Sequence, residues 1–179
     1  HRSDATRDGL RNLKENLRFA DELGAAHVLL MSGSRLHPAP CQQNILIENL
    51  KRAAPLAERY GVGLLLEPLN SLVDHKGYFL DNSGLGYEIM KCVDSPCVRR
   101  FFDIYHMQVL EANLTAILLD NLAYTCHLHA AGTPHRHEPY LGEGHCPRLL
   151  AAREAAASTG WAGAGYRTRQ EHGESAHHT

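Results

Sequence analysis

The stretch Val62-Gly63-Leu64-Leu65-Leu66-Glu67-Pro68 is a short apolar run that ends on a carboxylate. An apolar run of about four to eight residues with such boundaries is typical of a buried strand in a parallel sheet. Proline follows at once and cannot extend a central strand. Because ligands bind at the carboxyl ends of such strands in α/β folds, Glu67 is a candidate catalytic or metal-binding residue. The simpler interpretation is a glutamate that caps the next segment or is exposed in a loop.

Strand patterns of this kind recur along the chain and alternate with helical periodicity. The predicted strands cover residues 26–31, 62–66, 98–104, 123–130 and 161–166. The predicted helices cover residues 10–23, 42–60, 82–93, 113–122 and 147–159. We expect Pro55 to bend the second helix, Gly61 to end it, and Asn82 or Ser83 to cap the third. Strands that alternate with helices indicate βαβ units and a parallel sheet.

Length and composition limit the architecture to one ordinary domain. The chain has 179 residues, of which 44% are hydrophobic and 21% are charged. A complete (β/α)₈ barrel takes about 250 residues, so this length holds about five to six strand-helix units. The pattern therefore predicts an α/β fold, either an open doubly wound sheet or an incomplete barrel, over residues 1–167. Residues 168–179 are polar and without apolar periodicity, which predicts a disordered tail.

Charge and cysteine content exclude several classes of function. The net charge is −2, which gives no electrostatic case for binding nucleic acid or a membrane surface. The sequence contains no apolar run of about 18 residues, so we expect no transmembrane helix. The five cysteines include no C-x-x-C pair, which argues against a disulfide framework and a cysteine zinc site. A reducing, cytoplasmic location is the expectation.

Ligand-type side chains lie at the ends of three successive predicted strands. Glu67 ends one strand, Asp103 lies near the end of the next, and His129 near the end of the one after. Taken singly, the aspartate is more often a turn former and the histidine a packed core residue. Together, two carboxylates and an imidazole at one sheet edge predict a divalent metal site. Oxygen-rich ligation favours Mn²⁺ or Mg²⁺, and the histidine leaves Zn²⁺ and Co²⁺ open.

The loop after His129 contains Arg136, whose guanidinium could clamp a substrate carboxylate or phosphate. The simpler interpretation of this loop is a solvated segment of mixed charge.

Several motifs in this order resemble the hydroxypyruvate isomerase family, within the xylose-isomerase-like sugar isomerases and epimerases. They are Leu66-Glu67-Pro68-Leu69-Asn70, Phe102-Asp103-Ile104-Tyr105-His106, the run 127–139, Gly142-Glu143-Gly144-His145 and Gly160-Trp161. The resemblance extends from the first predicted helix to about Tyr166.

The resemblance implies a (β/α)₈ barrel with one divalent metal at its carboxyl-terminal mouth. It places metal ligands at Glu67, Asp103 and His129, and residues that bind substrate oxygens at His106 and Arg136. The implied reaction converts a ketose or keto acid into its aldehyde isomer, or epimerises a ketose, through an enediolate. Hydroxypyruvate to tartronate semialdehyde is the type reaction. Glu67 would then be both a metal ligand and the catalytic acid/base.

Two departures from the family pattern bear on activity. Gly165 stands where the family's last strand ends with a second glutamate, which is both ligand and proton-transfer partner. The first three strands of the family barrel have no counterpart in this chain. A partial barrel exposes two sheet edges, so we expect a fragment of a longer protein or closure by a partner chain, such as a homo-oligomer.

These observations predict a metal-dependent isomerase of a small keto acid or sugar, impaired by the truncation and by Gly165. Three alternatives remain open. They are a non-catalytic remnant that still binds a metal or sugar, a ketose 3-epimerase, and an endonuclease of the related apurinic-site family. The last is the weakest, because no basic groove is evident.

Overall fold

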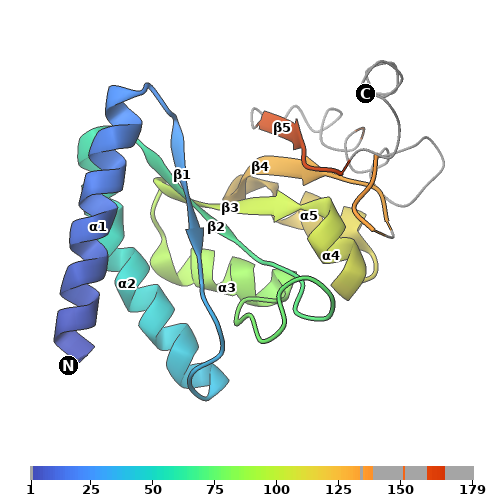
Figure 1. Cartoon of the computed structure of the whole chain (residues 1–179), viewed down its shortest axis with the longest axis horizontal. Coiled ribbons are helices and arrows are strands. Elements are labelled where there is room, and N and C mark those ends of the chain that lie inside the picture. The colour runs from blue at the N-terminus through green and yellow to red at the C-terminus, as the bar shows by residue number, and fades with distance from the viewer. Residues whose placement is uncertain (1, 134, 139–150, 152–160, 168–179) are drawn as a thin grey trace.

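A computed structural model describes residues 2–133, 135–138, 151 and 161–167. Helices and strands alternate along the chain, as the sequence predicts (Figure 1). The helices are α1 (Arg2–Glu22), α2 (Ala39–Tyr60), α3 (Ser83–Val93), α4 (Ile104–Leu110) and α5 (Leu114–Asp120), with a 3₁₀ turn at Leu122–Tyr124. The strands are β1 (His27–Met31), β2 (Gly63–Glu67), β3 (Val98–Asp103), β4 (Thr125–Ala130) and β5 (Trp161–Ala164).

The strands form one parallel sheet in the order β1-β2-β3-β4-β5. Connections between parallel strands are right-handed. When each new strand is added on the same side of the previous one, all connecting helices therefore lie on one face of the sheet. Helix α1 packs on α2 and α2 on α3, and Figure 1 shows this row beside the sheet. A doubly wound sheet reverses its strand order and has helices on both faces. The sequential order therefore identifies a segment of a (β/α) barrel.

The helices and the sheet enclose two apolar clusters. The larger lies between α1, α2, α3 and strands β2 and β3, with Leu17, Ala57 and Leu64 fully buried within it. The smaller surrounds Phe102 and Leu128 beneath α4 and α5. Both clusters pack on the helix-covered face of the sheet, while the opposite face carries a mixture of apolar and polar side chains.

Several local signals act as the sequence predicts. Gly61 ends α2 in the left-handed conformation with φ 62°, a conformation that favours glycine. The side chain of Asn82 caps α3 by accepting a hydrogen bond from Leu85 N at 2.7 Å. The bend expected at Pro55 stays a prediction: helix α2 is continuous through this residue, and both Pro55 and Lys51 are exposed. Solvent can therefore hydrate the Lys51 carbonyl, which the proline leaves without its helical donor.

The segment after β3 differs from the expectation. The predicted strand 98–104 ends at Asp103, and an unpredicted helix, α4, begins at the next residue. The 3₁₀ turn takes the first residues of the predicted strand 123–130, so β4 begins at Thr125. Of the predicted helix 147–159 only residue 151 is described, and it is helical, while the predicted disordered tail 168–179 lies outside the described residues.

The first strand presents apolar side chains on the face opposite the helices. Met31 is paired with Glu67 across β1 and β2, and it is 58% exposed, while Leu29 on the same face is 45% exposed. In a closed barrel this face would be interior, so the exposure agrees with an incomplete barrel. Among the described residues, no helix is both long enough and apolar enough to cross a bilayer.

Candidate functional site

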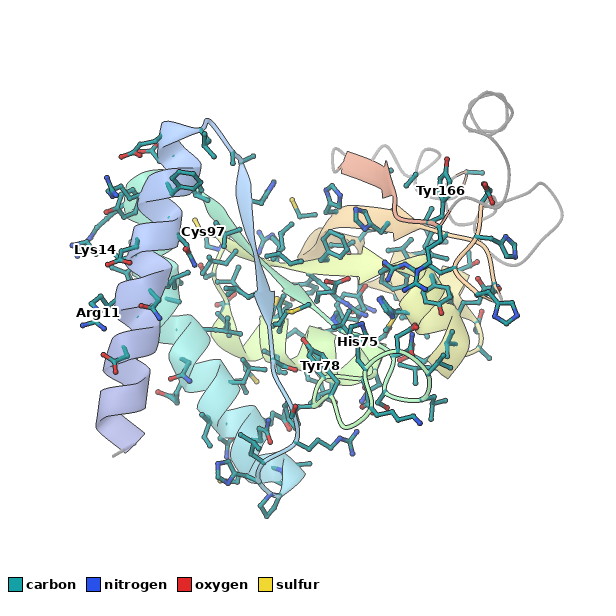
Figure 2. The ribbon with its side chains drawn as sticks, viewed as in Figure 1. Arg11, Lys14, His75, Tyr78, Cys97 and Tyr166 are labelled. Atoms are coloured by element: carbon teal, nitrogen blue, oxygen red, sulfur yellow. The ribbon has the colours of Figure 1, made fainter. Side chains whose placement is uncertain are left out.

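Glu67 lies at the end of β2 with only 5% of its surface exposed. Its backbone position is held by Tyr78, whose hydroxyl donates to the Glu67 carbonyl at 3.1 Å and accepts from Ser32 N at 2.8 Å. Figure 2 shows Tyr78 and His75 on the loop that follows β2. Burial, followed by the nearby charge of Asp103, raises the pKa of Glu67 to about 7, against a smaller lowering by Arg136. Burial and the neighbouring carboxylate therefore both favour the protonated form of Glu67 in the metal-free chain.

Asp103 ends β3 and is the N-cap of α4. Its Oδ1 accepts hydrogen bonds from Tyr105 N at 2.9 Å and His106 N at 3.4 Å. Its Oδ2 accepts from Arg136 Nη2 at 2.9 Å, and the side chain is 1% exposed. One oxygen thus anchors the helix while the other faces the site. The helix in turn places His106 beside the same carboxylate.

His106 lies in the first turn of α4 and is 1% exposed. Its Nε2 is 3.9 Å from Asp103 Oδ2, and its Nδ1 is 2.8 Å from Asn70 Nδ2. Burial is the largest cause that lowers the pKa of His106 to about 4; the charge of Asp103 opposes it, and the charge of Arg136 adds to the lowering. The ring is therefore neutral at physiological pH.

A cluster of potential metal ligands forms where these elements meet. Glu67, Asp103 and His106 each offer a ligand atom, and these atoms lie within 4.8 Å of one another. His129 is paired with Asp103 across β3 and β4 but is not a member of this group. The structure thus brings the two predicted carboxylate ligands together and places His106, a predicted substrate-binding residue, nearest to them.

His129 packs along the adjacent strands. Its ring lies edge-on to Phe101 at 4.6 Å between centroids. A Cβ added at Gly165 would lie 3.0 Å from His129 Nδ1, so the ring borders the end of β5. Burial, followed by the charge of Arg136, lowers the pKa of His129. A neutral imidazole is the form that binds metals, so the position stays compatible with ligation.

Arg136 connects the site to the end of β5. Its Nε donates to Gly165 O at 2.7 Å, and its Nη2 donates to Asp103. Its Nη1 lies 3.3 Å from His106 Nε2, and its guanidinium lies 5.3 Å from the centre of the Tyr105 ring. The residue adopts a left-handed backbone with φ 57°. The predicted positive group is therefore directed at the predicted carboxylates.

A family model described as a xylose isomerase-like TIM barrel matches residues 1–176. The chain belongs to this family. The resemblance predicted from the strand-end motifs is therefore confirmed at the level of family and fold.

Curated relatives in this family are named as isomerases. The 2-oxo-tetronate isomerase of Cupriavidus necator is 35% identical over 156 residues, covering 86% of this chain and 59% of its own length. The hydroxypyruvate isomerase of Escherichia coli is 30% identical over 168 residues, covering 93% of this chain and 64% of its own length. This chain thus spans about three fifths of the length of these curated relatives.

Solved structures show the same architecture. A protein of Brucella melitensis, described as an AP endonuclease of family 2, matches with a TM-score of 0.84 at 30% identity. The match covers 95% of this chain and 65% of that protein.

Gly165 lies just past β5, at the same edge of the sheet as Asp103 and His129. Its amide donates to Ala130 O at 3.0 Å, so this backbone continues the sheet beside β4. The space that a Cβ would enter is bordered by His129 Nδ1 at 3.0 Å and Arg136 Nη2 at 3.5 Å. The position is next to the predicted ligands, and it provides no ligand atom.

Sequence reasoning gave no role to Asn70, which is fully buried and bonded to His106. No local pattern could reveal this contact, since the two residues are 36 positions apart. The capping role of Asp103 did have a local signal. Aspartate is a preferred N-cap residue, so Asp103 is a signal for a helix that begins after it. Such a helix brings His106 of the same motif back to the Asp103 carboxylate.

Proposed function

We propose that this chain carries the site of a divalent-metal-dependent isomerase that acts on a small 2-keto acid or ketose. The reaction would convert hydroxypyruvate into tartronate semialdehyde, or an analogous keto compound into its aldehyde, through an enediolate. Support comes from relatives named hydroxypyruvate isomerase and 2-oxo-tetronate isomerase at 30–35% identity. The observation that carries the proposal is the convergence of the buried carboxylates Glu67 and Asp103 at adjacent strand ends, where they and His106 offer ligand atoms within 4.8 Å of one another.

Glu67 and Asp103 would hold the cation, with a histidine completing the protein ligands. Two carboxylates and an imidazole suit Mn²⁺ or Mg²⁺ and also admit Zn²⁺ or Co²⁺. A bound divalent cation would stabilise the negative charge that develops on an enediolate.

Glu67 is suited to move the proton between adjacent carbons. Its carboxylate form can accept a proton as a base and its protonated form can return that proton as an acid, which are the two steps that isomerisation requires. The Glu67 carboxylate would take a proton from the hydroxymethyl carbon of hydroxypyruvate and return it to the former carbonyl carbon. The hydroxyl proton passes from one oxygen to the other, so the substrate is isomerised without any net gain or loss of atoms.

Donor groups and a cleft beside the site suit an oxygen-rich, acidic substrate. A cleft of about 680 Å³ is lined by polar groups that include Arg136 and Arg167, Tyr105, Gln108 and the carboxylate of Asp74. The Arg167 amide donates to the Arg136 carbonyl at 2.7 Å, which places the two arginines side by side. Guanidinium groups bind carboxylates through paired hydrogen bonds, so this cleft can receive the acid end of a keto acid.

Gly165 favours an isomerase over a ketose 3-epimerase. Epimerisation removes a proton from one face of a carbon and returns one to the other face, so it needs an acid/base group on each side. Isomerisation moves a proton between adjacent carbons, and a single base on one face is enough. The described residues offer Glu67 on one side and a glycine at the position of the second carboxylate.

The test is a coupled assay for tartronate semialdehyde, with hydroxypyruvate as substrate and Mn²⁺ or Mg²⁺ added. Glu67→Gln should abolish turnover by the purified chain. The control is Glu58→Gln, the same change at an exposed residue of α2, which should leave turnover unchanged. Turnover that survives Glu67→Gln would remove Glu67 from the mechanism. Cleavage of abasic-site DNA, measured in parallel, tests the activity named for the Brucella relative.

A non-catalytic binding protein is the second candidate, and Gly165 is the observation that favours it. In that case the chain would bind one divalent cation, lose it on Asp103→Ala, and show no turnover with any keto acid. Calorimetric titration with Mn²⁺ distinguishes this candidate from a chain that neither binds metal nor catalyses.

A further inference from the structure

Asn70 uses its whole side-chain amide in hydrogen bonds within the protein. Its Oδ1 accepts from Val73 N and Asp74 N, each at 3.0 Å. Its Nδ2 donates to Asp74 Oδ2 at 2.7 Å and lies 2.8 Å from His106 Nδ1. Turning the amide over would place its NH₂ against two N–H donors and its oxygen against a carboxylate. The contacts therefore determine which end of the amide faces His106.

The orientation of Asn70 determines the proton position on His106. Nδ1 of His106 faces two donors, Asn70 Nδ2 at 2.8 Å and Asn70 N at 3.3 Å. It can satisfy them only with a lone pair, and a neutral imidazole then carries its proton on Nε2. The other tautomer would direct an N–H at two further N–H groups, in a place where Asn70 is fully buried.

The protonated Nε2 of His106 faces the catalytic side of the site. It lies 3.3 Å from Arg136 Nη1 and 3.9 Å from Asp103 Oδ2. A guanidinium has donors only, so the contact with Arg136 is an approach of two donors. An oxygen atom placed beside both nitrogens would accept from both.

A histidine that binds a metal through one nitrogen usually donates its other N–H to an acceptor. For His106 to ligate through Nε2, Nδ1 would have to carry the proton and find such an acceptor. The groups facing Nδ1 are the amide and backbone N–H donors of Asn70. The hydrogen-bond pattern thus opposes ligation by His106, although its distance to Glu67 and Asp103 permits it.

We propose that Asn70 is a positioning residue that holds His106 in the Nε2–H tautomer, which is the form that the substrate-binding role expected of His106 from the family resemblance requires and which leaves Nε2 no lone pair for a metal. The tautomer is a property of the free chain. The contact with a substrate oxygen rests on the proposed isomerase function. The assignment leaves Glu67, Asp103 and His129 as the candidate protein ligands.

The tautomer is measured by nitrogen NMR of the ¹⁵N-labelled, metal-free chain at neutral pH. The His106 signals are assigned by their loss in His106→Gln. We expect Nε2 to carry the directly bonded proton and Nδ1 to resonate as an unprotonated, pyridine-type nitrogen. A proton on Nδ1 with an unprotonated Nε2 would overturn the proposal, and this result does not depend on whether the chain is active.

A polarity swap tests whether Asn70 is the cause. Asn70→Asp combined with Asp74→Asn keeps composition and net charge and restores the bond between positions 70 and 74 in the opposite direction. An acceptor then faces His106, so Nδ1 should gain a proton. Asn82→Asp is the matched control, because its side-chain oxygen still caps α3 and His106 should stay unchanged. An unprotonated Nδ1 in the folded swap variant would contradict the proposal.

Adding Zn²⁺ to the labelled chain separates the donor role from ligation. Glu67→Gln and Asp103→Asn should weaken Zn²⁺ binding, while the His106 Nε2 proton should persist at saturating Zn²⁺. Loss of that proton on binding would make His106 a ligand and end the proposal. A chain that binds no Zn²⁺ would count against the proposed metal-dependent function, and the tautomer would still be decided by the metal-free spectrum.

Discussion

Replacing Glu67 by glutamine should stabilise the metal-free chain while removing its proposed acid/base group. Glu67 is 5% exposed, and its charged form is disfavoured first by burial and then by Asp103. Glutamine has nearly the same shape and no charge, so it relieves both effects. The prediction separates the cost of holding a buried carboxylate from any role of that side chain in packing.

The size of the effect follows from the pKa of Glu67, which is raised from 4.5 to about 7. As the pH rises between these values, the unfolded chain releases this proton before the folded chain does. Stability is therefore lost across this window, and the loss levels off above the folded pKa. The two pKa values differ by about 2.5, which corresponds to about 3 kcal/mol at about 1.4 kcal/mol per pKa unit. At pH 5 the same relation gives a destabilisation by Glu67 of under about 1 kcal/mol.

The measurement is urea unfolding of wild type and Glu67→Gln at pH 5, 6, 7 and 8 in the presence of a chelator. The advantage of the variant should grow with pH to about 3 kcal/mol at pH 8. Exposed Glu58→Gln should show no comparable trend. Adding Mn²⁺ should reverse the order, because a bound cation favours the carboxylate. A difference that is constant with pH, or a Glu67→Gln chain that is less stable at pH 8, would refute this reasoning.

Three further changes have defined outcomes. Gly165→Glu should raise Mn²⁺ affinity roughly tenfold in equilibrium dialysis by placing a carboxylate beside the site, whereas Gly9→Glu on α1, with nothing within 4 Å of its Cβ, should not. Asn82→Ala removes the oxygen that caps α3 and should lower the free energy of unfolding by about 1 kcal/mol in urea titration. Phe102→Ala empties a fully buried position and should cost about 3–5 kcal/mol in the same measurement.

Much of the fold could be predicted because its signals are local. The apolar run that ends at Glu67, the helix stop at Gly61 and the cap at Asn82 each depend on neighbours a few residues away. The sequence pattern does not predict helix α4, because an aspartate at this place fits a ligand at a strand end as well as a helix N-cap. One carboxylate serves both functions, since its two oxygens face different partners.

The candidate site was predicted in part. Glu67 and Asp103 meet as the strand ends imply, because neighbouring parallel strands end at the same edge. The position of His106 depends on the turn of α4, which brings it within 4.8 Å of both carboxylates in place of His129. Whether His106 is a metal ligand or a hydrogen-bond donor depends on its contact with Asn70, and no local pattern in the sequence predicts that contact.

The sequence by itself determined the alternation of strands and helices, the carboxylates at the strand ends and the glycine at position 165. These properties follow from periodicity and residue type, which need no knowledge of distant contacts. Only the tertiary structure decided the sequential strand order, the pKa of Glu67 and the proton position on His106. Each depends on groups far apart in the chain that folding places in contact and removes from water. Burial gives Glu67 its proton near neutral pH, and a buried amide 36 residues away determines what His106 can bind.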